Sequence, residues 1–157
     1  MTGDLIVRFE IQALFDAYCD CLDNDRMEEW QEFFVADCLY EIIPKENVDA
    51  GLPAPLIYCD NKRMLHDRVV SLRNANIFSP VLYRHFMSAV IWRRDDADLV
   101  VRSNYLVVNT SPLGESVVYQ TGRYDDRLKA TDRGWRFKSR RVVYDTARVQ
   151  TLLAIPI

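Results

Sequence analysis

The stretch VLYRHFMSAVIWRRDDADLVVRSNYLVVNT, residues 81–110, is the most informative part of the sequence about the fold. It holds two long runs rich in β-branched and aromatic residues, at about 81–94 and 98–110, and only three residues separate them. Two such runs around a short polar turn predict a β-hairpin. Two similar runs follow, at about 116–128 and 134–146. The second half of the chain is therefore predicted to be a four-stranded antiparallel meander.

The length of these runs also predicts the shape of the sheet. Each run is longer than the roughly 3–10 residues of an ordinary strand. Long strands must twist and bend, so we expect the sheet to curl around the segments that precede it. The expected shape is a half-open cone.

The first part of the chain is typical of helices. Near the N-terminus, apolar residues recur at helical spacing and form one stripe: Ile11, Leu14, Phe15, Tyr18 and Leu22. Asp25 with Glu28 three residues later resembles a capping box, which predicts the start of a second, short helix. That helix carries Trp30, whose large side chain we expect in the core.

Three further elements are predicted before the meander. A first strand at 38–44 is expected to end at Pro44. Residues 45–58 are predicted to form a loop, and loops of this length are often functional or interfacial. A helix capped by Asp60 is then expected to run to about Asn74.

Helices followed by an antiparallel meander predict an α+β fold, with a cone-shaped curved antiparallel sheet. The chain has 157 residues, which suits one domain with one core. We therefore expect residues 1–157 to form a single domain. The helices and first strand occupy about 1–75, and the meander occupies about 80–157.

Composition and charge exclude several classes of protein. Hydrophobic residues make up 49% and charged residues 27%, so the chain is expected to fold rather than stay disordered. The formal net charge of −3 argues against nucleic acid as a partner, because binding to a duplex needs a basic face. The basic strip of Arg136, Lys138, Arg140 and Arg141 is predicted to be the solvated face of a strand.

Localisation is predicted from what the sequence lacks. The N-terminal segment has no apolar core of a secretory signal. No run approaches the ~20 apolar residues needed to cross a bilayer. The four cysteines do not have the spacing of a zinc ribbon. We expect a cytoplasmic protein with reduced thiols and neither a membrane nor a nucleic-acid partner.

A cone with a helical lid can enclose a pocket, which raises the hypothesis of an enzyme. Small cone-shaped isomerases and dehydratases use Asp, His and Tyr for proton transfer, and the candidates here are His66, His85, Tyr40, Tyr83 and Asp37. His85 is the strongest, with Tyr83 on the same face. A lone histidine among apolar neighbours is nevertheless more typical of a hydrogen-bonded core residue than of a catalyst.

The sequence offers no metal or cofactor site. A facial iron site needs two histidines and a carboxylate, but His66 and His85 lie far apart in the sequence, with no carboxylate at a suitable spacing. A Rieske cluster needs paired Cys-x-His and Cys-x-x-His motifs, and neither occurs. We expect this chain to bind no metal and no cofactor.

Two features point to structural roles instead. Arg68 lies in the apolar stripe of the predicted 60–74 helix, and a buried guanidinium needs a carboxylate or carbonyl partner. Asp145 is one candidate partner. The nearly bare apolar tail, residues 151–157, carries Leu153 and Ile155, and we expect it to pack on the cone or on another chain.

The sequence resembles the small (beta) subunit of Rieske-type aromatic-ring-hydroxylating oxygenases over essentially its whole length. Four segments carry the resemblance: EWQEFFVADCLY at 29–40, MLHDRVVSL at 64–72, YRHF at 83–86 and SRRVVYD at 139–145. The segment PKENVDAGLP at 44–53 is similar to small subunits that serve substituted benzoates, such as salicylate, anthranilate or terephthalate.

The resemblance implies a division of labour between chains. The fold of this chain would be the cone of the nuclear-transport-factor-like superfamily. A large (alpha) subunit would carry the Rieske [2Fe-2S] cluster and the mononuclear Fe(II), in a hexamer of three large and three small subunits. A separate reductase would supply electrons from NAD(P)H. This chain would be non-catalytic, and the holoenzyme would insert oxygen into an aromatic carboxylate during aromatic catabolism.

The sequence is also compatible with two other functions. One is a stand-alone isomerase or dehydratase that uses His85 with a tyrosine or an aspartate. The other is a binding or adaptor module with no chemistry. If the chain is the small subunit, residues 45–58 and the C-terminal tail are expected at contacts with other chains. The structural and interface candidates are Trp30, Arg68, Arg84, Asp145, Leu153 and Ile155.

Overall fold

The computed structural model describes residues 2–75, 81–145 and 155–157. Helical segments and short elements make up the first part of the chain: α1 (Thr2–Asp23), the 3-10 helix η1 (Met27–Phe33), β1 (Phe34–Pro44), α2 (Lys45–Asp49), β2 (Ile57–Cys59) and α3 (Lys62–Ala75). Four long strands follow: β3 (Leu82–Asp95), β4 (Asp98–Thr110), β5 (Ser116–Thr131) and β6 (Gly134–Tyr144). The bounds of the predicted meander are thus reproduced to within a few residues.

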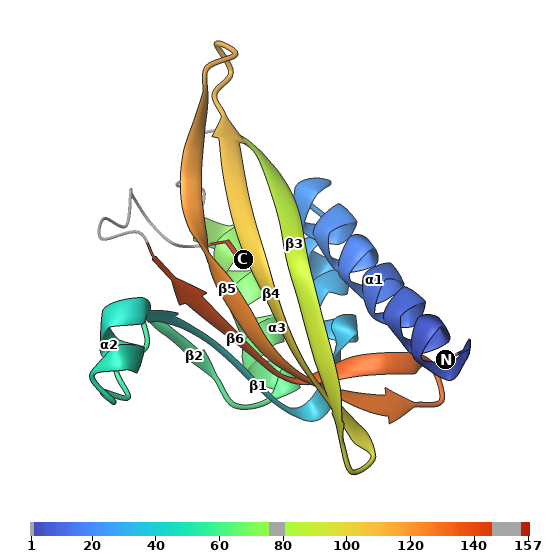
Figure 1. Cartoon of the computed structure of the whole chain (residues 1–157). Coiled ribbons are helices and arrows are strands. Elements are labelled where there is room, and N and C mark those ends of the chain that lie inside the picture. Colours follow the sequence, from blue (N-terminus) through green and yellow to red (C-terminus); the bar gives the residue numbers. More distant parts are fainter. Residues whose placement is uncertain (1, 76–80, 146–154) are drawn as a thin grey trace.

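A single six-stranded sheet with the order β2-β1-β6-β5-β4-β3 forms the body of the fold. It curls without closing, and α1 and α3 lie against it (Figure 1). Side chains from α1, η1, α3 and the inner face of the sheet form one hydrophobic core. The predicted α+β cone is confirmed, because the long strands bend around the helices as their length requires.

One pairing departs from the predicted antiparallel sheet. Strands β3, β4, β5 and β6 pair as an antiparallel meander, but β1 lies parallel to β6, with Ile42 opposite Val142. A parallel pair needs a long connection, and the chain between β1 and β6 provides one. No local pattern in the sequence predicts a pairing between strands that are so far apart in the chain.

The stripe predicted for the first helix faces the core. All five of its residues are buried, because the helical spacing places them on one side of α1. They account for most of the buried face of the helix, and Val7 and Cys21 complete it.

The helix starts differ from the predicted ones. Helix α3 is capped by Asn61, whose Oδ1 accepts a hydrogen bond from the Met64 N–H at 2.9 Å, and not by Asp60. Helix η1 has no side-chain cap, so the expected Asp25–Glu28 capping box is wrong. The predicted loop at 45–58 also contains the short helix α2 and the strand β2, which pairs with β1.

A β-bulge in β6 corrects the predicted orientation of the basic strip. On β5, Leu128 lies opposite Phe137 and Arg127 lies opposite Ser139, so Lys138 is the extra residue. Because side chains alternate with a period of two, one extra residue turns every later side chain to the other face. Arg140 is therefore buried inside the cone, and the interpretation of this residue as part of a solvated face is wrong.

Gly122 lies where β5 and β6 approach each other closely. A Cβ atom at this position would lie 2.0 Å from the Val143 carbonyl oxygen and 2.8 Å from the Tyr144 Cα. Both neighbours are backbone atoms of the paired strand, so they can move only if the pairing shifts. The sheet requires glycine here.

We expect Gly122→Ala to lower the free energy of unfolding by about 1–3 kcal/mol, because the methyl group overpacks a strand contact that cannot relax. Urea unfolding followed by circular dichroism measures the loss. Gly3→Ala is the matched control, since a Cβ there meets nothing within 4 Å. Equal stability of the two variants would contradict the close approach at Gly122.

Candidate functional site

The interior of the cone holds a buried ion pair between Arg140 and Asp126. These residues lie directly opposite each other on β6 and β5. Arg140 Nε donates to Asp126 Oδ1 and Arg140 Nη2 donates to Asp126 Oδ2, both at 2.9 Å. Neither side chain is exposed (0%). This two-pronged geometry is the strongest arrangement available to an arginine and a carboxylate.

Aromatic rings enclose the guanidinium of Arg140. Its central carbon lies 3.8 Å from the centroid of Tyr124, 4.3 Å from Phe137 and 4.4 Å from Tyr18. Ring faces attract a cation and exclude water at the same time. The arrangement stabilises the charge without exposing it, so Arg140 organises the core and offers nothing to a solute.

Burial and the charge of the partner both act on the pKa of each group in this pair. Burial raises the pKa of the Asp126 carboxyl, while the charge and hydrogen bonds of Arg140 act in the opposite direction. For Arg140, burial acts to lower the pKa, and the charge of Asp126 holds it above its ordinary value. Each group thus favours the charged form of the other, against the effect of burial.

A second polar cluster ties the last described residues to the core. Trp30 Nε1 donates to the Tyr18 hydroxyl at 3.1 Å, and that hydroxyl donates to the Ile157 carbonyl at 3.0 Å. The Ile157 N–H donates to the Tyr40 hydroxyl at 3.0 Å. Trp30 and Ile157 are fully buried. Trp30 and Tyr40 therefore have structural roles in the core, and burial raises the pKa of Tyr18 to about 12.

His85 is bonded to an aspartate that the sequence analysis did not single out. Its Nδ1 lies 2.6 Å from Asp23 Oδ1, and its backbone N–H donates to both carboxylate oxygens of Asp23 at 3.1 Å. The His85 side chain is only 1% exposed. The pair joins the end of α1 to β3. Among the described residues, no side chain bonds the second ring nitrogen, Nε2.

The other predicted acid–base candidates do not join this pair. His66 is exposed, and its Nδ1 lies 3.4 Å from Gln31 Nε2. Asp37 is also exposed. Tyr83 is half-buried against Tyr119, with ring centroids 5.4 Å apart, and burial raises its pKa. Tyr83 and His85 share the inner face of β3, but no hydrogen bond joins them.

The predicted partner of Arg68 is not found within the described part of the chain. Arg68 is half-buried, and none of the hydrogen bonds or ion pairs formed by the described residues involves it. Burial raises the pKa of Tyr40 and of Cys59, and the nearby charge of Arg68 acts against it. Among the described residues, Arg140 forms the fully buried ion pair of the cone, through its Nε and Nη2.

The remaining structural candidates lie in different surroundings. Arg84 and Asp145 are exposed, and the Asp145 N–H donates to the Thr121 carbonyl at 2.8 Å. Ile155 packs against the core cluster. Leu153 lies outside the described residues.

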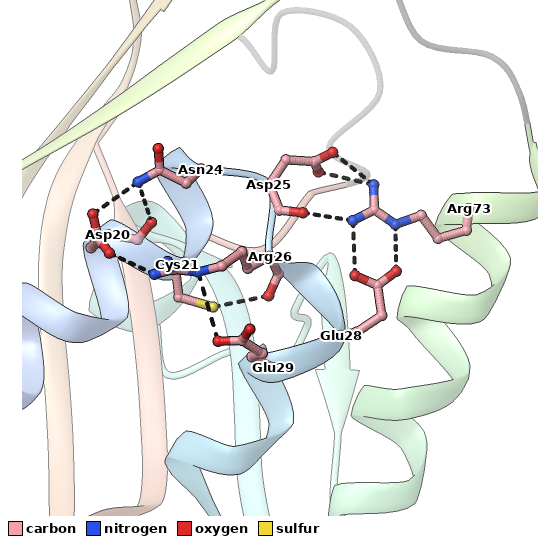
Figure 2. A network of polar contacts seen from close by, with 8 residues as sticks. All are labelled: Asp20, Cys21, Asn24, Asp25, Arg26, Glu28, Glu29 and Arg73. Carbon is pink, nitrogen blue, oxygen red and sulfur yellow. Dashed lines mark hydrogen bonds and ion pairs between the residues drawn. The ribbon is translucent and has the colours of Figure 1, made fainter.

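Arg73 of α3 binds the turn after α1 and the start of η1 at the surface. Its Nη1 bonds both carboxylate oxygens of Asp25 at 2.9 and 3.0 Å, and its Nε donates to Glu28 Oε1 at 2.6 Å (Figure 2). Arg73 also lowers the pKa of Glu28. Asp25 and Glu28, which the sequence suggested as a cap, instead hold α3 to the turn after α1. These groups are well exposed, so each pair contributes about 0–1 kcal/mol.

No three His, Cys, Asp or Glu side chains within residues 2–75, 81–145 and 155–157 gather as a metal site. The four cysteines are free thiols, and burial raises the pKa of Cys19 to about 12 and that of Cys38 to about 11. These thiols are poor ligands and poor nucleophiles as they stand. None of the helices in the described ranges is long and apolar enough to cross a lipid bilayer.

Comparison with known proteins decides the family. The family model described as ring hydroxylating beta subunit matches residues 18–151. The chain belongs to the ring-hydroxylating beta subunit family. This beta subunit is 53% identical to the anthranilate 1,2-dioxygenase small subunit of Burkholderia cepacia, over 100% of this chain and 98% of the relative. It is 34% identical to a terephthalate 1,2-dioxygenase beta subunit of Comamonas sp, over 98% and 100% of the two chains.

Solved structures agree with the family. The beta subunit assigned to an aromatic-ring-hydroxylating dioxygenase of Novosphingobium aromaticivorans has a TM-score of 0.90 and 42% identity, with 99% of each chain covered. The beta subunit of benzoate 1,2-dioxygenase from Burkholderia mallei has a TM-score of 0.71 at 19% identity, over 86% and 88% of the chains, which shows the same fold. The chain is thus a small subunit of an aromatic ring-hydroxylating dioxygenase, as the resemblance in its sequence implied.

Proposed function

We propose that this chain is the non-catalytic small subunit of a dioxygenase that acts on an aromatic acid of the anthranilate type. The observation that carries the proposal is the 53% identity, over the whole chain, to the anthranilate 1,2-dioxygenase small subunit. Other relatives belong to dioxygenases for terephthalate and 2-aminobenzenesulfonate. All three substrates named are benzene rings that carry an acid group.

The donor groups of this chain support a role without metal. A Rieske cluster takes two cysteines and two histidines, and the sequence has only two histidines. His85 is bonded to Asp23, and His66 is exposed and lies beside Gln31. The proposal therefore assigns the Rieske cluster and the mononuclear iron to a large subunit. A reductase would deliver electrons from NAD(P)H, and the assembly would hold three large and three small subunits in the cytoplasm.

The interior of the cone supports the same conclusion. Its charged groups, Arg140 and Asp126, neutralise each other and are closed off by aromatic rings. A catalytic acid or base must reach the proton that it transfers, and His85 is enclosed at 1% exposure. What the chain offers to a partner is its shape and its contact surface.

Co-expression with the large subunit tests the proposal. The two chains should purify together, and the complex should consume oxygen when anthranilate, the reductase and NADH are supplied. The small subunit alone should bind no iron and consume no oxygen. Turnover by the isolated small subunit, or failure of the two chains to associate, would overturn the proposal.

The alternative enzyme, which would use His85, makes an opposite prediction. We expect His85→Ala to leave the turnover number of the assembled dioxygenase unchanged. The variant should lose about 1–3 kcal/mol of stability, because Asp23 loses a buried hydrogen-bond partner. Oxygen uptake per assembled complex and urea unfolding measure the two effects.

His66→Ala is the control for that experiment. His66 is exposed, so its replacement should change stability by no more than about 0.5 kcal/mol. Complete loss of turnover in a stable, assembled His85→Ala variant would favour the acid–base enzyme.

A further inference from the structure

A groove of about 570 Å³ lies between α1 and the turn that joins β5 to β6. Its lining is largely apolar, with Ala13, Leu14 and Ala17 from α1, and with Phe33 and Trp135 across from them. Small side chains on α1 leave the space that makes the groove. Apolar surface of this kind is typical of places where another molecule binds.

Helix α1 carries a second apolar stripe that leads into the groove. Ile6, Phe9, Ala13 and Ala17 follow one another at helical spacing on a face of α1 that borders the core stripe. Phe9 is 76% exposed, and Leu5 and Ile6 beside it are also well exposed. The apolar surface thus continues beyond the groove along α1. It is larger than the surface that a small molecule would cover.

Within the described residues, Arg136 lines the groove and forms no ion pair, although the charges of Glu32 and Asp132 act on it. Arg133 pairs with Glu32 at 3.0 Å, and Glu10 accepts a hydrogen bond from Trp135 Nε1 at 2.8 Å. Arg136 donates only to a backbone carbonyl, and its Nε has no partner among the described residues. The occupant that fits is an apolar segment with a carboxylate.

The chain carries such a segment at the opposite end of the folded molecule. The hairpin between β4 and β5 projects away from the body of the molecule, while the β5–β6 turn lies toward the opposite end (Figure 1). Leu113 at its tip is 97% exposed, and Val117 and Val118 are exposed beside it. Glu115 is exposed and forms no side-chain hydrogen bond or ion pair with the described residues.

The tip of this hairpin has a defined shape. The Ser111 N–H donates to the Glu115 carbonyl, and the Gly114 N–H donates to the Ser111 carbonyl, both at 2.8 Å. Gly114 has a φ of 84°, which suits the left-handed position of such a turn. A preformed tip loses little conformational entropy when it binds.

We propose that the β4–β5 hairpin of one copy of this chain docks in the α1/β5–β6 groove of the next copy. Leu113 fills the apolar hollow, and Glu115 pairs with Arg136. A contact between two different surfaces is heterologous, and such contacts close into rings when the rotation allows it. The inference rests on the proposed function, in which three small subunits share one complex.

Site-specific photo-crosslinking in the co-expressed complex of large and small subunits tests this contact. A benzophenone side chain in place of Ala13, which lines the groove, should give a product with the mass of two small subunits. The attachment point should lie within residues 111–118. A product of one small and one large subunit, or no crosslink in an assembled complex, would overturn the proposal.

Charge exchange supplies an independent measurement. Arg136→Glu alone and Glu115→Arg alone should each reduce the yield of the crosslinked small-subunit dimer several-fold. The combined variant should restore most of the yield, because the ion pair is rebuilt with its ends exchanged. Arg63→Glu, an exposed residue of α3, is the control and should leave the yield unchanged. Failure of the combined variant to recover would contradict the pairing of Glu115 with Arg136.

The outcome for the proposed function is separate from the outcome for the groove. Association of the wild-type small and large subunits tests the function. The identity of the chain crosslinked at position 13 tests the groove. If the wild-type complex forms and is active but position 13 crosslinks to the large subunit, the proposed function is supported and the proposed contact between small subunits is wrong.

Discussion

Asp126→Ala is expected to lower the free energy of unfolding by about 3–5 kcal/mol, because it leaves a buried charge without its partner. Arg140 cannot lose its proton, and its guanidinium is closed off from water by Tyr124, Phe137 and Tyr18. Both hydrogen bonds to Asp126 are lost together. Urea unfolding of the purified small subunit measures the effect.

The adjacent aspartate provides a matched control. Asp125 lies on the same strand and pairs with Arg102 and Arg123, but its side chain is 29% exposed. Water replaces those contacts, so Asp125→Ala should cost only about 0–1 kcal/mol. Similar losses for the two alanine variants would show that burial of the ion pair does not govern stability.

A double variant separates the lost charge from the lost contacts. Replacing both partners removes the uncompensated cation, so Asp126→Ala combined with Arg140→Met should be more stable than Asp126→Ala alone. If the double variant is instead less stable by the sum of two single losses, the charge of Arg140 is not the cause of the destabilisation.

Trp30→Ala is the second change expected to have a large effect, at about 3–5 kcal/mol. The indole is fully buried and packs edge-on against Tyr40 and Phe34, with ring centroids 4.9 and 5.6 Å away. Its Nε1 also bonds the Tyr18 hydroxyl. Alanine leaves a cavity and deprives Tyr18 of a hydrogen-bond donor.

Phe9→Ala is the control for the aromatic substitution. Phe9 is 76% exposed on α1, so its removal from the isolated small subunit should change stability by about 0.5 kcal/mol or less. Thermal unfolding at equal protein concentration compares the two variants. A loss for Phe9→Ala as large as that for Trp30→Ala would show that α1 is more deeply packed than the structure has it.

The candidate sites were only partly predictable. His85 was correctly expected to be a hydrogen-bonded core residue, but its partner Asp23 ends a helix 62 positions earlier. Asp126 and Arg140 were missed as a pair. The sequence does show an aspartate in one β-rich run and an arginine in the next. That the two residues lie opposite each other follows only from the register between the two strands.

The hairpins of the meander, the buried stripe of α1 and the family could all be predicted from the amino-acid sequence. These features depend on residues that are close together in the chain, where side-chain period and turn chemistry act directly. The parallel pairing of β1 with β6 and the inward position of Arg140 could be seen only in the folded chain. The physical reason is that both depend on pairing between distant strands, and the extra residue at Lys138 reverses the side chains that follow it.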